Sequence, residues 1–191
     1  MDNAQLRANL ERHHNESFGW ALVCCAHNRS EAESVLQVVY LKVLEGKARF
    51  DGNSSFRTWL FAVIRRTAAD ERRRHWLRGF GLSKYFARSE ATTASNPPDE
   101  DIYRSQVQQL FRRALAELPA RQREILQLVF YHDLSLAEAA EVMGISLGSA
   151  RTHYDRGKQR LRALMKGVAR RHDTERRAGS QRVVSTTETR G

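Results

Sequence analysis

The sequence predicts an all-α protein with two small helical domains joined by a flexible linker, the second of which contains a helix-turn-helix. Apolar residues recur every three or four positions in both halves of the chain, and no alternating strand pattern is sustained. Between the halves, a stretch without large apolar side chains carries the pair Pro97-Pro98. The predicted organisation is a first domain at 1–80, a linker at 81–104, a second domain at 105–166 and a disordered basic tail at 167–191.

The first domain is predicted to be helical from Leu6 to about Arg74. One stripe of its last helix should face a core, and it consists of Phe56, Leu60, Val63 and Thr67, with Trp59 and Ile64 at its flanks. The opposite face carries Arg57, Phe61, Arg65, Ala68 and Arg72. Arginines around an aromatic ring suit single-stranded nucleic acid, because they hold phosphates while the ring stacks on a base. Packing of Phe61 against a neighbouring helix is the alternative interpretation.

After the linker, a second apolar stripe is followed by a breaker at Pro119, and the stripe consists of Val107, Leu110, Phe111, Ala114, Leu115 and Leu118. A short helix from Leu136 to Met143, a turn of Gly144-Ile145-Ser146 and a basic helix from about Leu147 then follow. This order is typical of a helix-turn-helix, in which Gly144 supplies the positive φ of the turn. Small side chains at Ala139 and Ala140 let the second helix cross closely.

The basic helix has a predicted buried side of Ala150, Tyr154, Gly157, Leu161 and Leu164. Its outward face presents Arg151, Thr152, His153, Asp155, Arg156, Lys158 and Gln159, a set that suits a major groove. Arg151 and Arg156 are the leading base or phosphate contacts. We expect Asp155 to pair with Arg151 or Gln159 one turn away, or to accept from a cytosine amine. An ordinary helical hairpin with a solvated charged face is the alternative.

The charge of the chain favours a polyanionic partner, since 32 Lys and Arg against 22 Asp and Glu give a net charge of +10. No segment has the roughly 20 apolar residues of a membrane span, and no signal sequence is evident, so we expect a cytoplasmic protein without direct membrane insertion. Paired carboxylates and glycine-rich phosphate loops are not evident either, and we expect neither catalysis nor a cofactor.

A metal-dependent enzyme or sensor is suggested by five potential ligands close in sequence: His13, His14, Cys24, Cys25 and His27. Adjacent cysteines point in different directions on a helix and lack the spacing of metal sites, so we expect no metal. Small buried thiols and surface histidines are the alternative interpretation, in a reducing compartment.

Two sets of linked motifs resemble the extracytoplasmic-function sigma factors of the sigma-70 family. The first set resembles domain two of that family and consists of Glu31-Ala32-Glu33 through Leu41, Arg49-Phe50-Asp51, Ser55 to Phe61 and Ala68 to Arg74. Domain four is resembled by Ala114 to Leu126 together with the helix-turn-helix. The resemblance covers most of residues 6–166 and implies a bacterial transcription initiation factor.

The resemblance implies core RNA polymerase, promoter DNA and an anti-sigma factor as partners, with the largest-subunit clamp helices and the flap of the second largest subunit as polymerase contacts. It assigns polymerase binding to Glu33, Gln37, Tyr40 and Leu41. It assigns minus-ten capture and melting to the Ser55 to Arg73 segment, with Arg57, Trp59, Phe61, Arg65, Thr67, Arg72 and Arg73 as candidates. It assigns minus-thirty-five contacts to Arg151, Thr152, His153, Asp155, Arg156 and Lys158.

The chain departs from the family pattern at four positions: Ser34, Val38, Thr67 and Asp155. Ser34 and Val38 replace usual acids on the polymerase-facing helix.

A helix-turn-helix regulator that is not a polymerase subunit is the alternative function, and it explains only the C-terminal half. Promoter-specific transcription with core polymerase separates the two functions.

Overall fold

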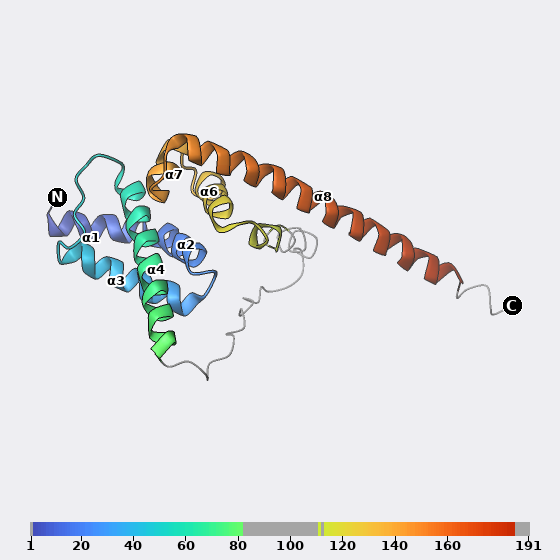
Figure 1. Cartoon of the computed structure of the whole chain (residues 1–191), viewed down its shortest axis with the longest axis horizontal. Helices are drawn as coiled ribbons and strands as arrows, with labels where there is room; N and C mark the ends of the chain where they lie inside the picture. The colour runs from blue at the N-terminus through green and yellow to red at the C-terminus, as the bar shows by residue number, and fades with distance from the viewer. Residues whose placement is uncertain (1, 82–110, 112, 186–191) are drawn as a thin grey trace. The chain divides into compact units, whose positions relative to one another are not determined.

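The computed structural model describes residues 2–81, 111 and 113–185, and these residues form helices joined by turns, without a strand (Figure 1). The helices are α1 (Asn3–Arg12), α2 (His14–Cys24), α3 (Arg29–Leu44), α4 (Phe56–Gly81), α6 (Ala120–Phe130), α7 (Leu136–Met143) and α8 (Leu147–Ser185). The predicted all-α class is confirmed. The chain divides into two compact units: unit 1 is Met1–Ser95 with Glu124–Thr152, and unit 2 is Asn96–Arg123 with His153–Gly191.

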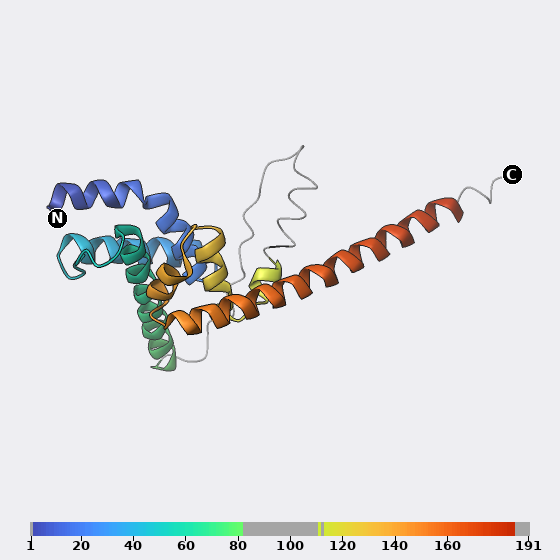
Figure 2. The same ribbon diagram turned by 90° about the horizontal axis from the view of Figure 1, so that it is seen from above.

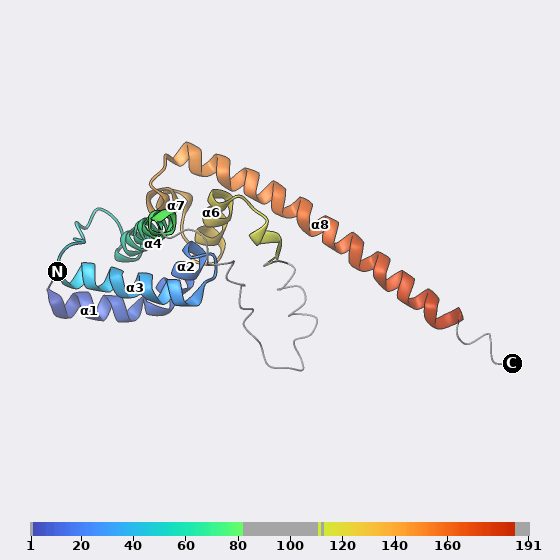
Figure 3. The ribbon, with the colours of Figure 1, turned by 60° about the horizontal axis from the view of Figure 1, so that its bottom comes forward.

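The core of unit 1 is built where α2, α3 and α4 pack against one another, and α1 lies alongside α3 (Figures 2 and 3). Fully buried side chains come from all three helices, among them Trp20, Val39, Leu60 and Ile64. Burial of an aliphatic side chain of this size stabilises a fold by roughly 1.5–3 kcal/mol. The indole Nε1 of Trp20 donates to the backbone carbonyl of Phe61 at 3.0 Å, so the polar atom of the ring is satisfied inside the core. α7 also packs on α4 within unit 1.

Local capping explains where the first helices begin. Asp2 accepts from the backbone N–H of Gln5, whose side chain accepts from the N–H of Asp2, so α1 starts with a reciprocal capping box. Asn28 accepts from the N–H of Glu31 at the start of α3. The turn between α2 and α3 contains two non-glycine residues at positive φ, Ala26 at 51° and His27 at 65°.

The buried face of α4 is rotated from the predicted one. Sequence analysis placed Phe61 and Ala68 on the face opposite the core stripe, with packing of Phe61 against a neighbouring helix as the alternative, and both residues are buried. The side chains of Phe56 and Val63, predicted to face the core, are only half-buried. The fully buried set is Thr58, Leu60, Phe61, Ile64, Thr67 and Ala68. The buried arc is wide because α4 packs against α2, α3 and α7, not against one neighbour.

The ends of the long helices also differ from expectation. α4 continues past Arg74 to Gly81, and most of the predicted linker at 81–104 lies outside the described residues. Residues 113–116 are helical and the helix ends before Pro119, as predicted. α8 continues to Ser185, past the predicted start of the tail at residue 167. The segment 167–185 has no proline to interrupt the helix, and its five arginines favour helix.

In the part of the chain that the structure describes, no helix combines the length and the apolar composition needed to cross a membrane.

Candidate nucleic-acid interface

The helix-turn-helix is set by local hydrogen bonds. Ser135 caps α7: its Oγ accepts from the backbone N–H of Glu138 at 3.2 Å, and the Glu138 carboxylate accepts from the Ser135 N–H at 2.9 Å. The Ser135 N–H, together with the Ser135 hydroxyl at 2.8 Å, donates to the Glu138 carboxylate, and these two hydrogen bonds hold the pKa of Glu138 below its usual range. Gly144 ends the helix with φ 63° and ψ 41°, and the N–H of Ile145 donates to the Ala140 carbonyl at 3.0 Å. The predicted bounds of α7 and the positive φ of Gly144 are confirmed.

α8 begins at Leu147 because Ser146 caps it, its Oγ accepting from the backbone N–H of Ser149 at 3.2 Å. Ala150 and Gly157 are buried, as the sequence predicts for the inner side of this helix. The other predicted inner residues, Tyr154, Leu161 and Leu164, are half-buried. Thr152 donates its hydroxyl to the Gly148 carbonyl at 3.0 Å, which leaves its methyl group and oxygen lone pairs outward.

The predicted minus-thirty-five residues form an accessible row at the start of α8. Arg151, Thr152, Asp155 and Arg156 are exposed, while His153 and Lys158 are half-buried. Among the residues that the structure describes, neither Arg151 nor Arg156 has an ion-pair partner. A guanidinium without a protein partner is available for a bidentate contact with a guanine edge or a phosphate.

Asp155 pairs differently from the prediction. Its carboxylate lies 3.2 Å from the Nζ of Lys158, not against Arg151 or Gln159. The same ammonium group lies 4.1 Å from the ring centroid of Tyr154. Lys158 sits three residues from Asp155, which is one of the two spacings at which side chains are neighbours on a helix surface. Lys158 is thereby held against the helix surface and is less available to a phosphate than the two arginines.

The arginines at the two ends of the α4 segment are engaged mainly with nearby protein groups. Arg57 lies 3.6 Å from Glu16, and Arg73 lies 3.2 Å from Asp70 on its own helix. Arg72 is exposed but donates to the backbone carbonyl of Cys24 at 3.4 Å. The exposed pairs can exchange their partners for a phosphate at small cost, because surface ion pairs contribute little stability.

The uncharged α4 candidates lie in the core or at its edge. Trp59 is half-buried in an aromatic cluster, with ring centroids 5.4 Å from Phe50 and 5.2 Å from Phe56. Thr67 is buried and accepts a hydrogen bond from the Nζ of Lys42 at 3.1 Å. Neither side chain is free to stack on a base without rearrangement of its neighbours.

Phe61 does not form an exposed stacking platform. It is fully buried, its ring stacks on Trp20 with centroids 6.0 Å apart, and His132 meets it edge-on at 4.8 Å. Arg65, one turn further on, donates to the carboxylate of Glu124 at 2.9 Å. Sequence reasoning missed His132 and Glu124 because both are more than fifty residues away along the chain. No local pattern signals a long-range partner.

The predicted polymerase-binding residues lie on one face of α3. Glu33, Gln37 and Leu41 are exposed, and Leu41 is a large apolar side chain that remains 57% accessible. Tyr40 is half-buried, its hydroxyl is 3.0 Å from Nδ1 of His14, and burial raises its pKa. Beside this face, a groove of about 490 Å³ is lined by Arg7, Leu10, Glu11, His14, Tyr40 and Leu44. Tyr40 therefore belongs both to this face and to the lining of the groove.

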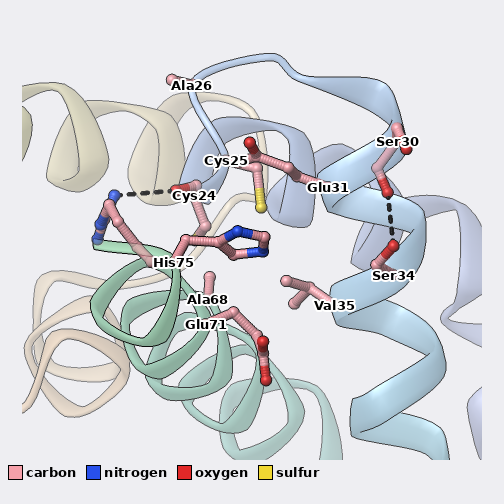
Figure 4. Close-up of a pocket in the computed structure, with 11 residues that line it drawn as sticks. Cys24, Cys25, Ala26, Ser30, Glu31, Ser34, Val35, Ala68, Glu71 and His75 are labelled. Carbon is pink, nitrogen blue, oxygen red and sulfur yellow. Dashed lines mark hydrogen bonds between the residues drawn. The ribbon is translucent and has the colours of Figure 1, made fainter. Parts of the chain in front are cut away.

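A second pocket, of about 290 Å³, surrounds the two cysteines, with His75 of α4 opposite Ser30 and Ser34 of α3 (Figure 4). Burial raises the pKa of the Cys24 thiol well above its usual range and raises that of the Cys25 thiol to about 11. Since metals bind the thiolate, this environment disfavours a metal ligand. Among the described residues, no group of three or more His, Cys, Asp or Glu is placed to hold a metal ion.

The comparisons with known proteins identify two conserved regions in the chain. Residues 10–78 match the model of sigma-70 region 2, and residues 108–161 match that of sigma-70 region 4. The RNA polymerase sigma factor CarQ of Myxococcus xanthus is 30% identical over 141 residues, which are 72% of this chain and 76% of CarQ. The sigma factor YlaC of Bacillus subtilis is 29% identical over 140 residues, 73% of this chain and 80% of YlaC.

A solved structure, the sigma factor RpoE of Bartonella quintana in complex with the anti-sigma factor NepR, shares the fold with a TM-score of 0.68. It is 23% identical, and the alignment covers 85% of this chain and 97% of RpoE. This chain belongs to the sigma-70 family of RNA polymerase sigma factors, in its extracytoplasmic-function group.

Proposed function

We propose that the chain binds core RNA polymerase and directs it to specific promoters, with α8 reading the minus-thirty-five element and α4 engaging the minus-ten element. The observation that carries this proposal is the exposure of Arg151 and Arg156 near the start of α8, which is the second helix of the helix-turn-helix. The first helix of the motif, α7, is capped by Ser135. The region 2 match supports a polymerase subunit over a separate regulator, because a regulator accounts for the C-terminal half alone.

The proposed polymerase contact is the α3 face of Glu33, Gln37, Tyr40 and Leu41. Its exposed leucine and the adjacent groove fit an apolar partner surface, and Glu33 supplies a charge at the rim, paired to Arg29 at 2.9 Å. We also propose that an anti-sigma protein regulates the chain. The support is the RpoE structure, which was determined as a complex with the anti-sigma factor NepR.

The test is transcription by purified core polymerase on fragments of the host genome, with and without the chain. We expect new transcripts that share an upstream motif, and Arg156→Ala should reduce them. Arg12→Ala is the matched control, because Arg12 is an exposed arginine at the end of α1, away from the helix-turn-helix. Sequence-specific DNA binding without any transcript would favour the separate regulator.

A further inference from the structure

Helix α8 extends well beyond the part of the chain that matches a sigma-70 region. The region 4 match ends at residue 161, whereas α8 continues to Ser185. Residues 160–185 carry eight basic and two acidic side chains, a net charge of +6 out of the +10 of the whole chain. The proposed minus-thirty-five contacts end at Lys158, so they leave this charge without a role.

The first basic residues of this extension are accessible to a partner. Arg160, Arg162 and Lys166 are exposed. None of the three has an ion-pair partner among the residues that the structure describes. They share this availability with Arg156, one turn before Arg160, and a guanidinium in this state can bind an anion.

Four arginines along α8 fall on one side of the helix. With 3.6 residues per turn, their positions lie within an arc of about 100° around the helix axis, and the positions of the acids Asp173 and Glu175 lie outside it. Over the length of this row the helix measures about 32 Å, which is roughly nine base pairs of DNA. The row consists of Arg156, Arg160, Arg170 and Arg177 and is called the arginine stripe below.

The composition of the extension favours a phosphate backbone as the partner. The large apolar residues of the segment 167–185 are Val168, Val183 and Val184. They are too few for the apolar face that a helix buries in a membrane surface or in a protein groove. Phosphates require positive charge alone, and the stripe begins at Arg156, which is already a proposed DNA contact.

We propose that the arginine stripe extends the minus-thirty-five contact along the phosphate backbone of the flanking DNA. This inference rests on the proposed function, because it requires Arg156 to face the duplex. The duplex bends toward α8, since a straight helix otherwise leaves the curved surface of straight DNA after a few turns. The contact adds affinity without sequence information, because every base pair presents the same phosphates.

The test variant removes three charges of the stripe in the full-length chain and keeps Arg156. Glutamine has a helix propensity close to that of arginine, so α8 should stay helical, and circular dichroism checks this. The matched control removes three charges from other sides of the same helix. The test variant is Arg160→Gln with Arg170→Gln and Arg177→Gln, and the control variant is Arg162→Gln with Arg176→Gln and Arg182→Gln.

Holoenzyme binding to labelled promoter DNA is measured by fluorescence anisotropy over a salt series. Each lost phosphate contact lowers the slope of log K against log salt by about 0.9, so we expect a slope lower by about two to three in the test variant. The control variant should keep nearly the wild-type slope. Ethylation of single phosphates beside the minus-thirty-five element should weaken binding of the wild type and not of the test variant. Energy transfer between dyes at the two ends of the promoter should report a smaller bend with the test variant.

Equal slopes in the test and control variants would overturn the role of the stripe, and so would an unchanged bend or identical ethylation patterns in wild type and test variant. Vesicles of anionic lipid test the competing partner: binding that the test variant loses, with unchanged promoter slopes, would assign the stripe to a membrane surface. Absence of transcription by the wild-type holoenzyme would instead overturn the proposed function. The slope comparison, repeated with the free chain, would then still decide whether the stripe binds DNA.

Discussion

Helices α4 and α8 are both rich in arginine, yet the structure uses their charges differently. On α4, the guanidinium groups of Arg57, Arg65 and Arg73 pair with protein carboxylates. At the start of α8, Arg151 and Arg156 are exposed without such partners among the described residues. The α8 arginines are thus accessible for the proposed contact with DNA, whereas those of α4 would first have to release their protein partners.

The contrast shows that a basic segment predicts an affinity for polyanions, but not whether its arginines are free of acidic protein partners. Availability depends on which acidic groups the fold brings near. Glu16 and Glu124 reach α4 from other helices, whereas the single acid near the start of α8, Asp155, is taken by Lys158. The following substitutions test this difference, beginning with the largest expected effect.

Phe61→Ala should lower the free energy of unfolding by about 3–5 kcal/mol, because it leaves a cavity between Trp20 and His132. Urea unfolding followed by circular dichroism measures this effect. Phe130→Ala is the matched control: Phe130 is 54% exposed, and its truncation should cost much less. Equal stability of wild type and Phe61→Ala would return Phe61 to the surface and restore the stacking-platform interpretation.

Arg156→Ala should weaken promoter binding by the holoenzyme by about 1–3 kcal/mol, as expected for loss of a base-contacting arginine. Fluorescence anisotropy with labelled promoter DNA measures the affinity, and repeating it over a salt series separates the two contact types. A reduced salt slope with unchanged sequence preference would indicate a phosphate contact. A loss of affinity that depends on the identity of one base pair would indicate base readout. Unchanged affinity on every promoter would contradict the assignment of Arg156.

Acidification should destabilise the packing of His132 on Phe61. Burial is the largest influence on the pKa of His132 and lowers it. The charges of Glu16 and Asp133 raise the pKa, and that of Arg57 lowers it, but these effects are smaller than that of burial. The unfolded chain therefore binds the proton more readily, so stability is fully present above the ordinary histidine pKa of about 6.5 and declines as the pH falls below it.

Unfolding measured between pH 7.5 and 5 should show this decline, and His132→Gln should show a flatter dependence. A parallel decline in both proteins would assign the pH effect to the other histidines. A rise in stability on acidification would contradict the buried, neutral state of His132.

Asp155→Ala should have the smallest effect, a strengthening of holoenzyme binding to promoter DNA by less than about 1 kcal/mol. The substitution releases Lys158 from an exposed ion pair and removes a negative charge near the phosphates. The measurement is the same anisotropy titration, on promoters that vary the bases of the minus-thirty-five element. Weaker binding confined to promoters with a cytosine at one position would show that Asp155 accepts from that base.

The sequence by itself determined the elements whose partners are local. The bounds of α7, the capping box of Ser135 and Glu138 and the positive φ of Gly144 all follow from residues three to five positions apart. The region 2 and region 4 motifs could likewise be recognised without coordinates. The extent of α8 could not be predicted in this way, because the apolar periodicity that marks a helix ends at about residue 166 while α8 continues to Ser185.

Only the tertiary structure decided what α4 does with its aromatic ring and its arginines. Phe61 meets His132, and Arg65 meets Glu124, across separations of more than fifty residues. Such contacts depend on how whole helices pack, and helical periodicity gives the spacing of a face but not which neighbours will cover it. The turn and the helix bounds of the helix-turn-helix could therefore be predicted from the sequence, while the accessibility of the α4 face could not.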